Sequence, residues 1–458
     1  MTYHIDESPP ADEFRTHYID NLRTTLTTLL IIQHSITETA SSSHPYFKST
    51  PLTILVFLIK TVTVGLFFFV SGYSAYASRF PQTSYPSYYA NRGLSKAAFI
   101  WKRSLRLALP GVVYGIFGHV ILWFLLSKSW PQFFGVGSMD NDLGEGRDLE
   151  APALWELSRF EGPVAHLLFL YLLDLGFALC GPSRLVPTPG GLLSPSTAHG
   201  SLKPKNLETP KTTRKPFPFE VKSRKDAYIL YSLSFALLWL WTFAVAATRL
   251  AEKPRWRFGF SVASYDSISP SAPVLQLLAY LAGIKLREWR KFMLIPGRYA
   301  GVALVGALVA SAGTLFAGMR FSTIIRELVD LNTPWPIHPS FIDGGINFHT
   351  LFFSLWSVFA FFALSLTIVS FYAEREWTRR DWGPVSRHTY IPMWFHMIPI
   401  IVFVKLLAAD GSQWSFGLQK TVWAPELPQE SVGWRCFLVS TGSLLCSWFV
   451  GLACAAFT

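Results

Sequence analysis

The chain has 458 residues, of which 50% are hydrophobic, 16% aromatic and only 15% charged, and its formal net charge is +11. A mean hydropathy of +0.31 is too high for an ordinary soluble enzyme, so composition predicts a polytopic membrane protein. The excess positive charge does not indicate a nucleic-acid partner. The basic residues cluster between apolar runs, where orientation in a lipid bilayer accounts for them.

Residues 1–17 begin the chain with several acidic side chains and no apolar stretch of the kind found in a cleaved signal peptide. We expect a cytosolic N-terminal tail here, followed by one transmembrane domain over 18–458. Ten apolar runs in that domain are long enough, or nearly so, to span a bilayer. They cover residues 20–39, 52–77, 105–126, 163–182, 228–248, 273–288, 299–318, 348–372, 389–408 and 435–456.

The distribution of basic residues predicts which ends of these helices face the cytosol. Most Lys and Arg residues fall on one side if the N-terminus is cytosolic, whereas acidic residues concentrate in the loop 127–162 on the other side. The stretch 183–227 is rich in Pro, Gly, Ser, Thr and Lys and has few residues to bury, so it predicts a flexible cytosolic loop. We therefore expect an all-α transmembrane bundle of about ten helices with both termini in the cytosol.

The first apolar run carries an unusual polar stripe. Arg23 and His34 are eleven residues apart, so on a helix they share one face and lie about 16 Å apart along its axis. Asp20, Thr27 and Glu38 fall near the same line. Ionisable residues are costly inside a membrane helix, so the stripe is a candidate functional site.

His34 and Glu38 are one helical turn apart. A carboxylate at this spacing can fix the tautomer of an imidazole and increase its basicity, as a general base that acts on a hydroxyl requires. The alternative is a histidine at a helix end that forms a hydrogen bond with a neighbouring helix. The alignment with Arg23 favours the functional interpretation.

Further candidates follow in the later runs. Ser71-Gly72 permits close approach of a neighbouring helix. Arg103 and Arg106 are three residues apart, which suits binding of phosphates, although cytosolic helix ends attract basic residues in general. His396, with Tyr390 before it, is either an acceptor-binding residue or a core histidine.

His166 is a weaker candidate of the same kind as His396. The four cysteines show no metal-ligand spacing, and we expect no metal cofactor. The sequence has no G-x-S-x-G element, no P-loop and no H-E-x-x-H motif. These absences argue against the corresponding hydrolases, nucleotide-binding proteins and metalloproteases.

In this order the motifs resemble the acyltransferase-3 family of integral membrane O-acyltransferases, and the opening resembles fungal members. The family's Asp-x-x-Arg and Arg-x10-His correspond to Asp20, Arg23 and His34. Its Phe-Phe-x-x-Ser-Gly-like element corresponds to residues 67–72, and its Arg-x-x-Arg to Arg103 and Arg106. A Tyr-containing helix that ends in His is matched loosely by residues 390–396.

The resemblance implies a role for each matched residue. Cytosolic acyl-CoA, often acetyl-CoA, would be the co-substrate, with Arg103 and Arg106 on its phosphates and Arg23 on the pantetheine or the acyl carbonyl. His34 would deprotonate an acceptor hydroxyl or assist attack on the thioester. Ser71 and His396 would shape the acceptor side.

The chain also departs from the family pattern around residues 162–166 and at Trp394 and Met397. Both departures affect the expected acceptor pocket, so the acceptor is less constrained than the reaction. The absence of an attached extracytoplasmic hydrolase-like domain favours a small amphiphile over a large polysaccharide.

The sequence therefore predicts an acyl-CoA-dependent O-acyltransferase that acts on a hydroxyl of a small lipid-soluble metabolite or a glycan, in the endomembrane system or plasma membrane. Two alternatives from other classes stay open. One is a proton-coupled transporter or flippase that uses the polar stripe. The other is a membrane-bound terpenoid cyclase in which Glu38 or Asp174 donates a proton. The sequence does not predict the oligomeric state.

Overall fold

A computed structural model gives the fold of the described part of the chain. It describes residues 17–42, 50–79, 95–118, 121, 162–180, 223–247, 272–328, 346, 348–408 and 429–456. The predicted N-terminal tail, most of the predicted loop 183–227 and the acidic loop 127–162 lie outside these residues. Within them the regular structure is helical and contains no strand, so the all-α prediction is confirmed.

The described part of each of the ten apolar runs is helical. The long helices are α1 (His17–Ser42), α2 (Thr50–Arg79), α8 (Gly162–Cys180), α9 (Arg224–Ala247), α10 (Ala272–Met293), α11 (Gly297–Leu328), α12 (Phe348–Glu374) and α17 (Gln429–Ala456). The third run is divided into α3 (Lys96–Arg103), η3 (Ser104–Ala108), α4 (Leu109–Val113) and η4 (Tyr114–Gly118), and the ninth into α15 (Tyr390–Phe395) and α16 (Met397–Ala408). Two short helices, α13 (Glu376–Arg379) and α14 (Pro384–Arg387), connect α12 to α15.

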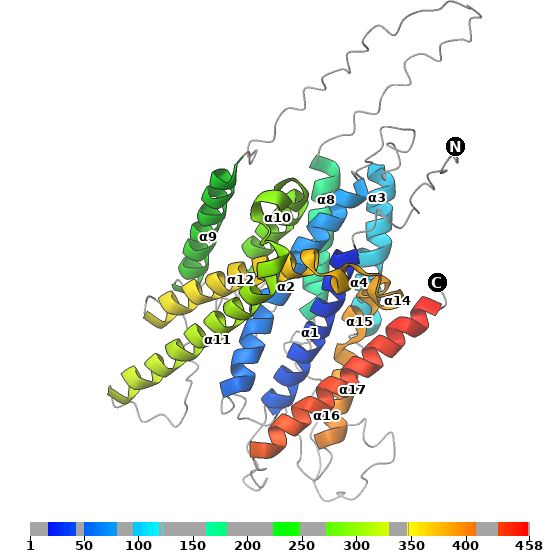
Figure 1. Cartoon of the computed structure of the whole chain (residues 1–458). Coiled ribbons are helices and arrows are strands. Elements are labelled where there is room, and N and C mark those ends of the chain that lie inside the picture. Colours follow the sequence, from blue (N-terminus) through cyan, green and yellow to red (C-terminus); the bar gives the residue numbers. More distant parts are fainter. Residues whose placement is uncertain are drawn as a thin grey trace, which may run out of the picture.

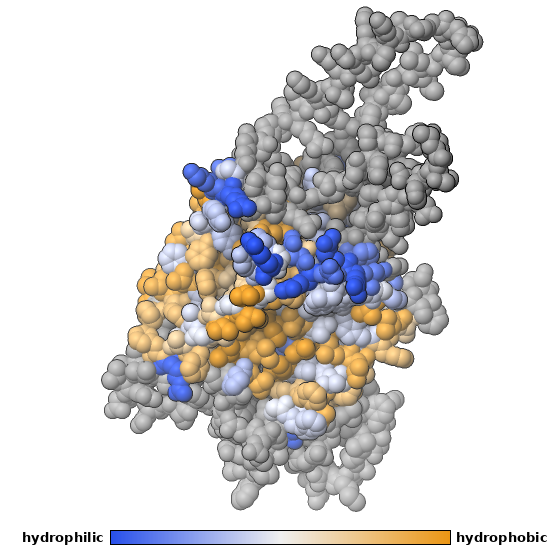
Figure 2. All heavy atoms as spheres, viewed as in Figure 1, coloured by the Kyte–Doolittle hydropathy of each residue, from blue (hydrophilic) through white to orange (hydrophobic). Residues whose placement is uncertain are grey.

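Five of the described helices are long and apolar enough to cross a membrane. They include α2, α9, α11, α12 and α17, while α8 and α10 contain shorter apolar stretches. Apolar side chains cover the middle of the visible face, and hydrophilic residues gather mainly along its upper edge (Figure 2). Large exposed apolar residues such as Val302 on α11 and Phe449 on α17 fit a surface in contact with lipid. The chain is an all-α helical membrane protein.

Helix α1 lies inside the bundle, where it contacts α2, α12, α15, α16 and α17. It begins, and α17 ends, at the same end of the bundle (Figure 1). Its buried apolar side chains include Leu22, Leu26 and Ile31. On the polar stripe of α1, Arg23, Thr27 and Glu38 are buried as well, whereas Asp20 and His34 are partly exposed.

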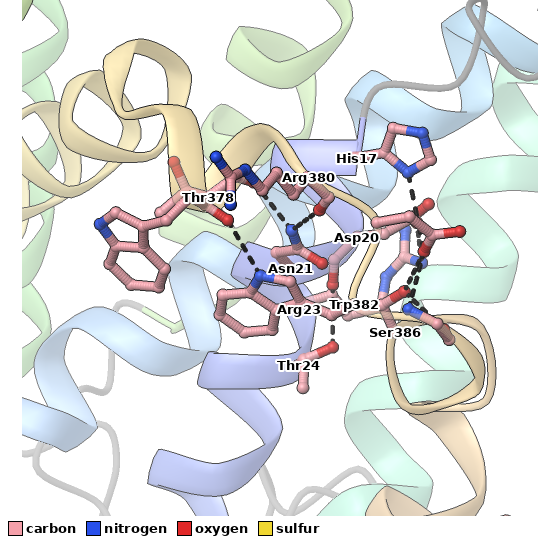
Figure 3. A network of polar contacts seen from close by, with 12 residues as sticks. His17, Asp20, Asn21, Arg23, Thr24, Thr378, Arg380, Trp382 and Ser386 are labelled. Carbon is pink, nitrogen blue, oxygen red and sulfur yellow. Dashed lines mark hydrogen bonds and ion pairs between the residues drawn. The ribbon is translucent and has the colours of Figure 1, made fainter.

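The connection between α12 and α15 is fastened to the start of α1 (Figure 3). The amide of Asn21 donates hydrogen bonds to the carbonyl oxygens of Thr378, at 2.8 Å, and Arg380, at 2.7 Å. Asn21 is fully buried, so these bonds satisfy a polar group that would be costly without partners. They fix the position of the segment that leads into α15 relative to α1.

Two glycines bring the backbones of α2 and α10 close together. A Cβ atom at Gly72 would overlap the carbonyl oxygen of Tyr280, and one at Gly283 would overlap the carbonyl oxygen of Phe69. Small residues allow this approach between membrane helices. The expectation that Ser71-Gly72 permits close helix contact is confirmed.

We expect Gly283→Ala to destabilise the bundle by about 1–3 kcal/mol or more, because the added methyl group meets backbone atoms, which cannot move aside as a side chain can. Gly306→Ala on α11 is the matched control, since a Cβ there has no neighbour within 4 Å. Thermal unfolding in detergent compares the two variants. Equal unfolding temperatures would contradict the close contact of α2 and α10.

Candidate active site

A buried polar cluster surrounds Arg23 on α1. Its Nη1 donates to Asp20 Oδ1 at 3.1 Å, and its Nη2 donates to the hydroxyl of Ser74 on α2 at 2.9 Å. The guanidinium also lies 5.2 Å from the centre of the Tyr390 ring on α15. Arg23 is only 4% exposed, so three helices hold this cation in place through charge, hydrogen bonding and its contact with the ring.

Arg106 approaches the same aromatic ring from the third helical run. Its guanidinium lies 4.9 Å from the centre of the Tyr390 ring. Arg106 belongs to the π-helical turn η3, where the Leu109 amide donates to the Ser104 carbonyl. Pro110 has no amide hydrogen to donate to the carbonyl of Arg106, which favours a wider turn at this point. Within the described residues no carboxylate lies within ion-pair distance of Arg106, so its charge is available to a ligand.

Arg103 is engaged differently from Arg106. Its Nε lies 3.2 Å from Asp174 Oδ2 on α8, and the other oxygen of Asp174 accepts a 2.6 Å hydrogen bond from the Tyr280 hydroxyl on α10. Arg103 is 5% exposed and Asp174 is fully buried. This ion pair joins three helical segments and neutralises Arg103, whereas sequence spacing alone predicted equivalent roles for the two arginines.

Two histidines meet further along α1. The ring centres of His34 and His396 are 5.2 Å apart, and the ring planes are tilted by 49°. His396 is completely buried between α15 and α16, whereas His34 is partly exposed. The contact places a histidine from late in the chain beside the histidine of the α1 stripe.

The geometry thus sets an arginine cluster and a histidine pair along one face of α1. A family model described as an acyltransferase domain matches residues 16–452, which is nearly the whole chain. The chain belongs to the acyltransferase-3 family. Curated proteins and solved structures give no significant match to this acyltransferase.

Two side-chain contacts connect α1 of the acyltransferase with the segment that contains α15. Arg23 contacts Tyr390, and His34 contacts His396. Because eleven residues on a helix rise about 16 Å, the two contacts lie well apart along α1. Two arginines therefore surround Tyr390 beside one part of α1, and two imidazoles meet further along the helix.

The remaining predicted site residues lie on the surrounding helices. Glu38 is buried one turn beyond His34 on α1. Ser71 is buried on α2, next to the close contact with α10. His166 is partly buried near the start of α8. The roles of Ser71 and His166 in acceptor binding stay predictions.

Sequence reasoning missed several residues that organise this site. The sequence suggested Asp174 as the proton donor of a terpenoid cyclase, whereas the structure pairs it with Arg103 and Tyr280. Ser74 and Asn21 were not singled out. The only available signal was their polarity in apolar helices, and that signal does not identify partners on other helices.

Proposed function

We propose that this acyltransferase is an integral membrane O-acyltransferase that moves an acyl group, and in particular acetyl, from acyl-CoA to a hydroxyl of a small lipid-soluble metabolite or a glycan. The proposal rests on the arrangement along α1, where the arginine cluster around Arg23 and the histidine pair at His34 lie about 16 Å apart. A thioester cofactor has the matching shape, with charged phosphates at one end and the reactive carbonyl at the end of a long arm.

Arg106 is the best candidate for the phosphates of acyl-CoA. It contacts an aromatic ring and has no carboxylate partner within ion-pair distance in the described part of the chain. The guanidinium group is planar and permanently charged, which suits phosphate oxygens. Arg103 lies in the same region, but its charge is paired with Asp174. Arg23, about 16 Å from His34 along α1, is suited to the pantetheine arm.

His34 is the proposed general base. One of its nitrogens takes the proton of the acceptor hydroxyl while the hydroxyl oxygen attacks the thioester carbonyl carbon. The C–S bond then breaks, the thiolate of CoA takes the proton back, and the ester is released. Glu38, one turn away and buried, is proposed to assist by orienting His34 or by favouring its charged form.

The ion pair of Asp174 with Arg103 disfavours the cyclase alternative for that residue. One oxygen of Asp174 contacts the guanidinium of Arg103, and the other accepts a hydrogen bond from Tyr280, so both oxygens are engaged by side chains of the protein itself. A terpenoid cyclase would need an available carboxylic acid in the site. The proposed acyl transfer through His34 does not require Asp174 to act as an acid.

We expect Arg106→Gln to raise the KM for acyl-CoA by about tenfold or more, because a hydrogen bond to a charged group contributes roughly 1.5–3 kcal/mol. Arg298→Gln is the matched control, since Arg298 is an exposed arginine at the start of α11 and lies outside the proposed site. Initial rates at varied acyl-CoA concentration measure both variants. An unchanged KM in Arg106→Gln would remove this residue from the cofactor site.

The function itself is tested in the native host. Untargeted metabolite comparison of cells that carry the unmodified protein with cells that carry His34→Ala should show an acylated compound lost and its free hydroxyl form accumulated. A change in the position of a compound across the membrane, without a change in its mass, would instead support a transporter.

A further inference from the structure

The imidazole of His396 is fixed in one tautomer by its surroundings. Its Nδ1 lies 2.7 Å from the carbonyl oxygen of Met393. A carbonyl oxygen only accepts hydrogen bonds, so Nδ1 carries the hydrogen and Nε2 carries the lone pair. His396 lies between α15 and α16, and the bond to the carbonyl three residues earlier holds its ring.

The Nε2 atom of His396 is buried and has no hydrogen-bond partner within the described part of the chain. An unsatisfied buried acceptor is destabilising, so this atom requires an explanation. The ring is 0% exposed, which leaves no surface for an acceptor molecule to touch. The neighbouring ring of His34, whose centre is 5.2 Å away, is partly exposed.

We propose that His396 is a positioning residue whose Nε2 accepts the N–H of His34 during catalysis. A small rotation of the partly exposed His34 ring brings one of its nitrogens within the ~3 Å that such a bond requires. The other nitrogen of His34 then carries the lone pair and faces the acceptor hydroxyl. This inference rests on the proposed O-acyltransferase function.

The proton balance of the step is unchanged by this arrangement. His34 takes the hydroxyl proton as the new C–O bond forms, and its second N–H continues to donate to Nε2 of His396. The proton leaves His34 for the sulfur of CoA as the C–S bond breaks. His396 stays neutral throughout, which suits an apolar interior because a buried carboxylate in its place would carry a larger desolvation cost.

Two variants separate this proposal from a purely structural role for His396. His396→Phe keeps an aromatic ring but removes the acceptor nitrogen, and His396→Gln keeps an acceptor oxygen on a side chain of similar reach. We expect His396→Phe to lower kcat roughly 10- to 100-fold with little change in the KM for acyl-CoA. His396→Gln should recover a substantial part of kcat.

A second readout does not depend on acyl transfer. Diethyl pyrocarbonate acylates the neutral nitrogen of histidine, and mass spectrometry of peptides that contain His34 measures the rate. We expect slower labelling of His34 in His396→Phe than in the unmodified protein, with the rate restored in His396→Gln.

Equal labelling rates in the unmodified protein and both His396 variants would overturn the proposal. So would a His396→Gln variant that folds, as judged by its thermal unfolding, but labels and reacts as slowly as His396→Phe. If the unmodified protein transfers no acyl group, the proposed function fails, and the labelling rates still decide whether His396 orients His34.

Discussion

Replacing His34 by alanine is expected to lower kcat for acyl transfer by about 100- to 10,000-fold, because this is the range that a positioned general base contributes. Binding of acyl-CoA should persist, since the arginine cluster around Tyr390 lies about 16 Å away along α1. Rates with saturating acyl-CoA, together with a direct binding measurement on the same purified protein, separate the two effects.

His17→Ala provides the control for this variant. His17 is also a histidine on α1, but it lies at the start of the helix, where its Nδ1 is 3.8 Å from Asp381 Oδ1. We expect its removal to leave kcat within about twofold, because 17 residues of helix, about 25 Å, separate His17 from His34. A His34→Ala variant that is as active as His17→Ala would contradict the assignment of His34 as the base.

Asp174→Asn is expected to reduce the free energy of unfolding by about 3–5 kcal/mol, because it leaves the buried Arg103 without its counter-charge. The substitution keeps the size of the side chain and an oxygen that can accept from Tyr280, so the loss is mainly electrostatic. Thermal or denaturant-induced unfolding in detergent measures the effect.

Two further variants isolate the cause of that loss. Tyr280→Phe removes only the hydrogen bond to Asp174 and should cost about 1–2 kcal/mol. The double variant Arg103→Met with Asp174→Leu removes both charges and should recover much of the stability lost in Asp174→Asn. Additive losses in the double variant would show that the two residues do not act as a pair.

The helical architecture could be predicted from hydropathy because a membrane span requires a long apolar run, and such runs are visible in the sequence. The breaks within the runs could not. The third run contains π-helical turns around Pro110, and the ninth is interrupted at His396. Both depend on local backbone hydrogen bonding, to which hydropathy is insensitive.

The candidate site was predicted residue by residue, but its contacts were not. Helical spacing placed Arg23 and His34 on one face of α1, and the family resemblance drew attention to Arg106 and His396. Neither argument shows that Tyr390 contacts two arginines or that His396 contacts His34. These contacts join segments far apart in the sequence, and without the fold nothing specifies which faces meet.

The different roles of Arg103 and Arg106 illustrate the same limit. Their spacing suggested one phosphate-binding face, yet Arg103 is neutralised by Asp174 on another helix. Spacing describes a regular α-helix, and the π-helical turn at Arg106 departs from it. The number of cations available to a cofactor therefore depends on tertiary contacts.

Acyl transfer that depends on His34 is tested most directly with the purified protein reconstituted into lipid vesicles. Acetyl-CoA labelled in its acetyl group is supplied with a lipid extract of the native host, and the acetylated products are identified by mass spectrometry. We expect labelled ester with the unmodified protein and almost none with His34→Ala. The proposed acyltransferase function would be contradicted if all label stayed on CoA while a compound moved across the vesicle membrane in a way that depends on a proton gradient and on His34.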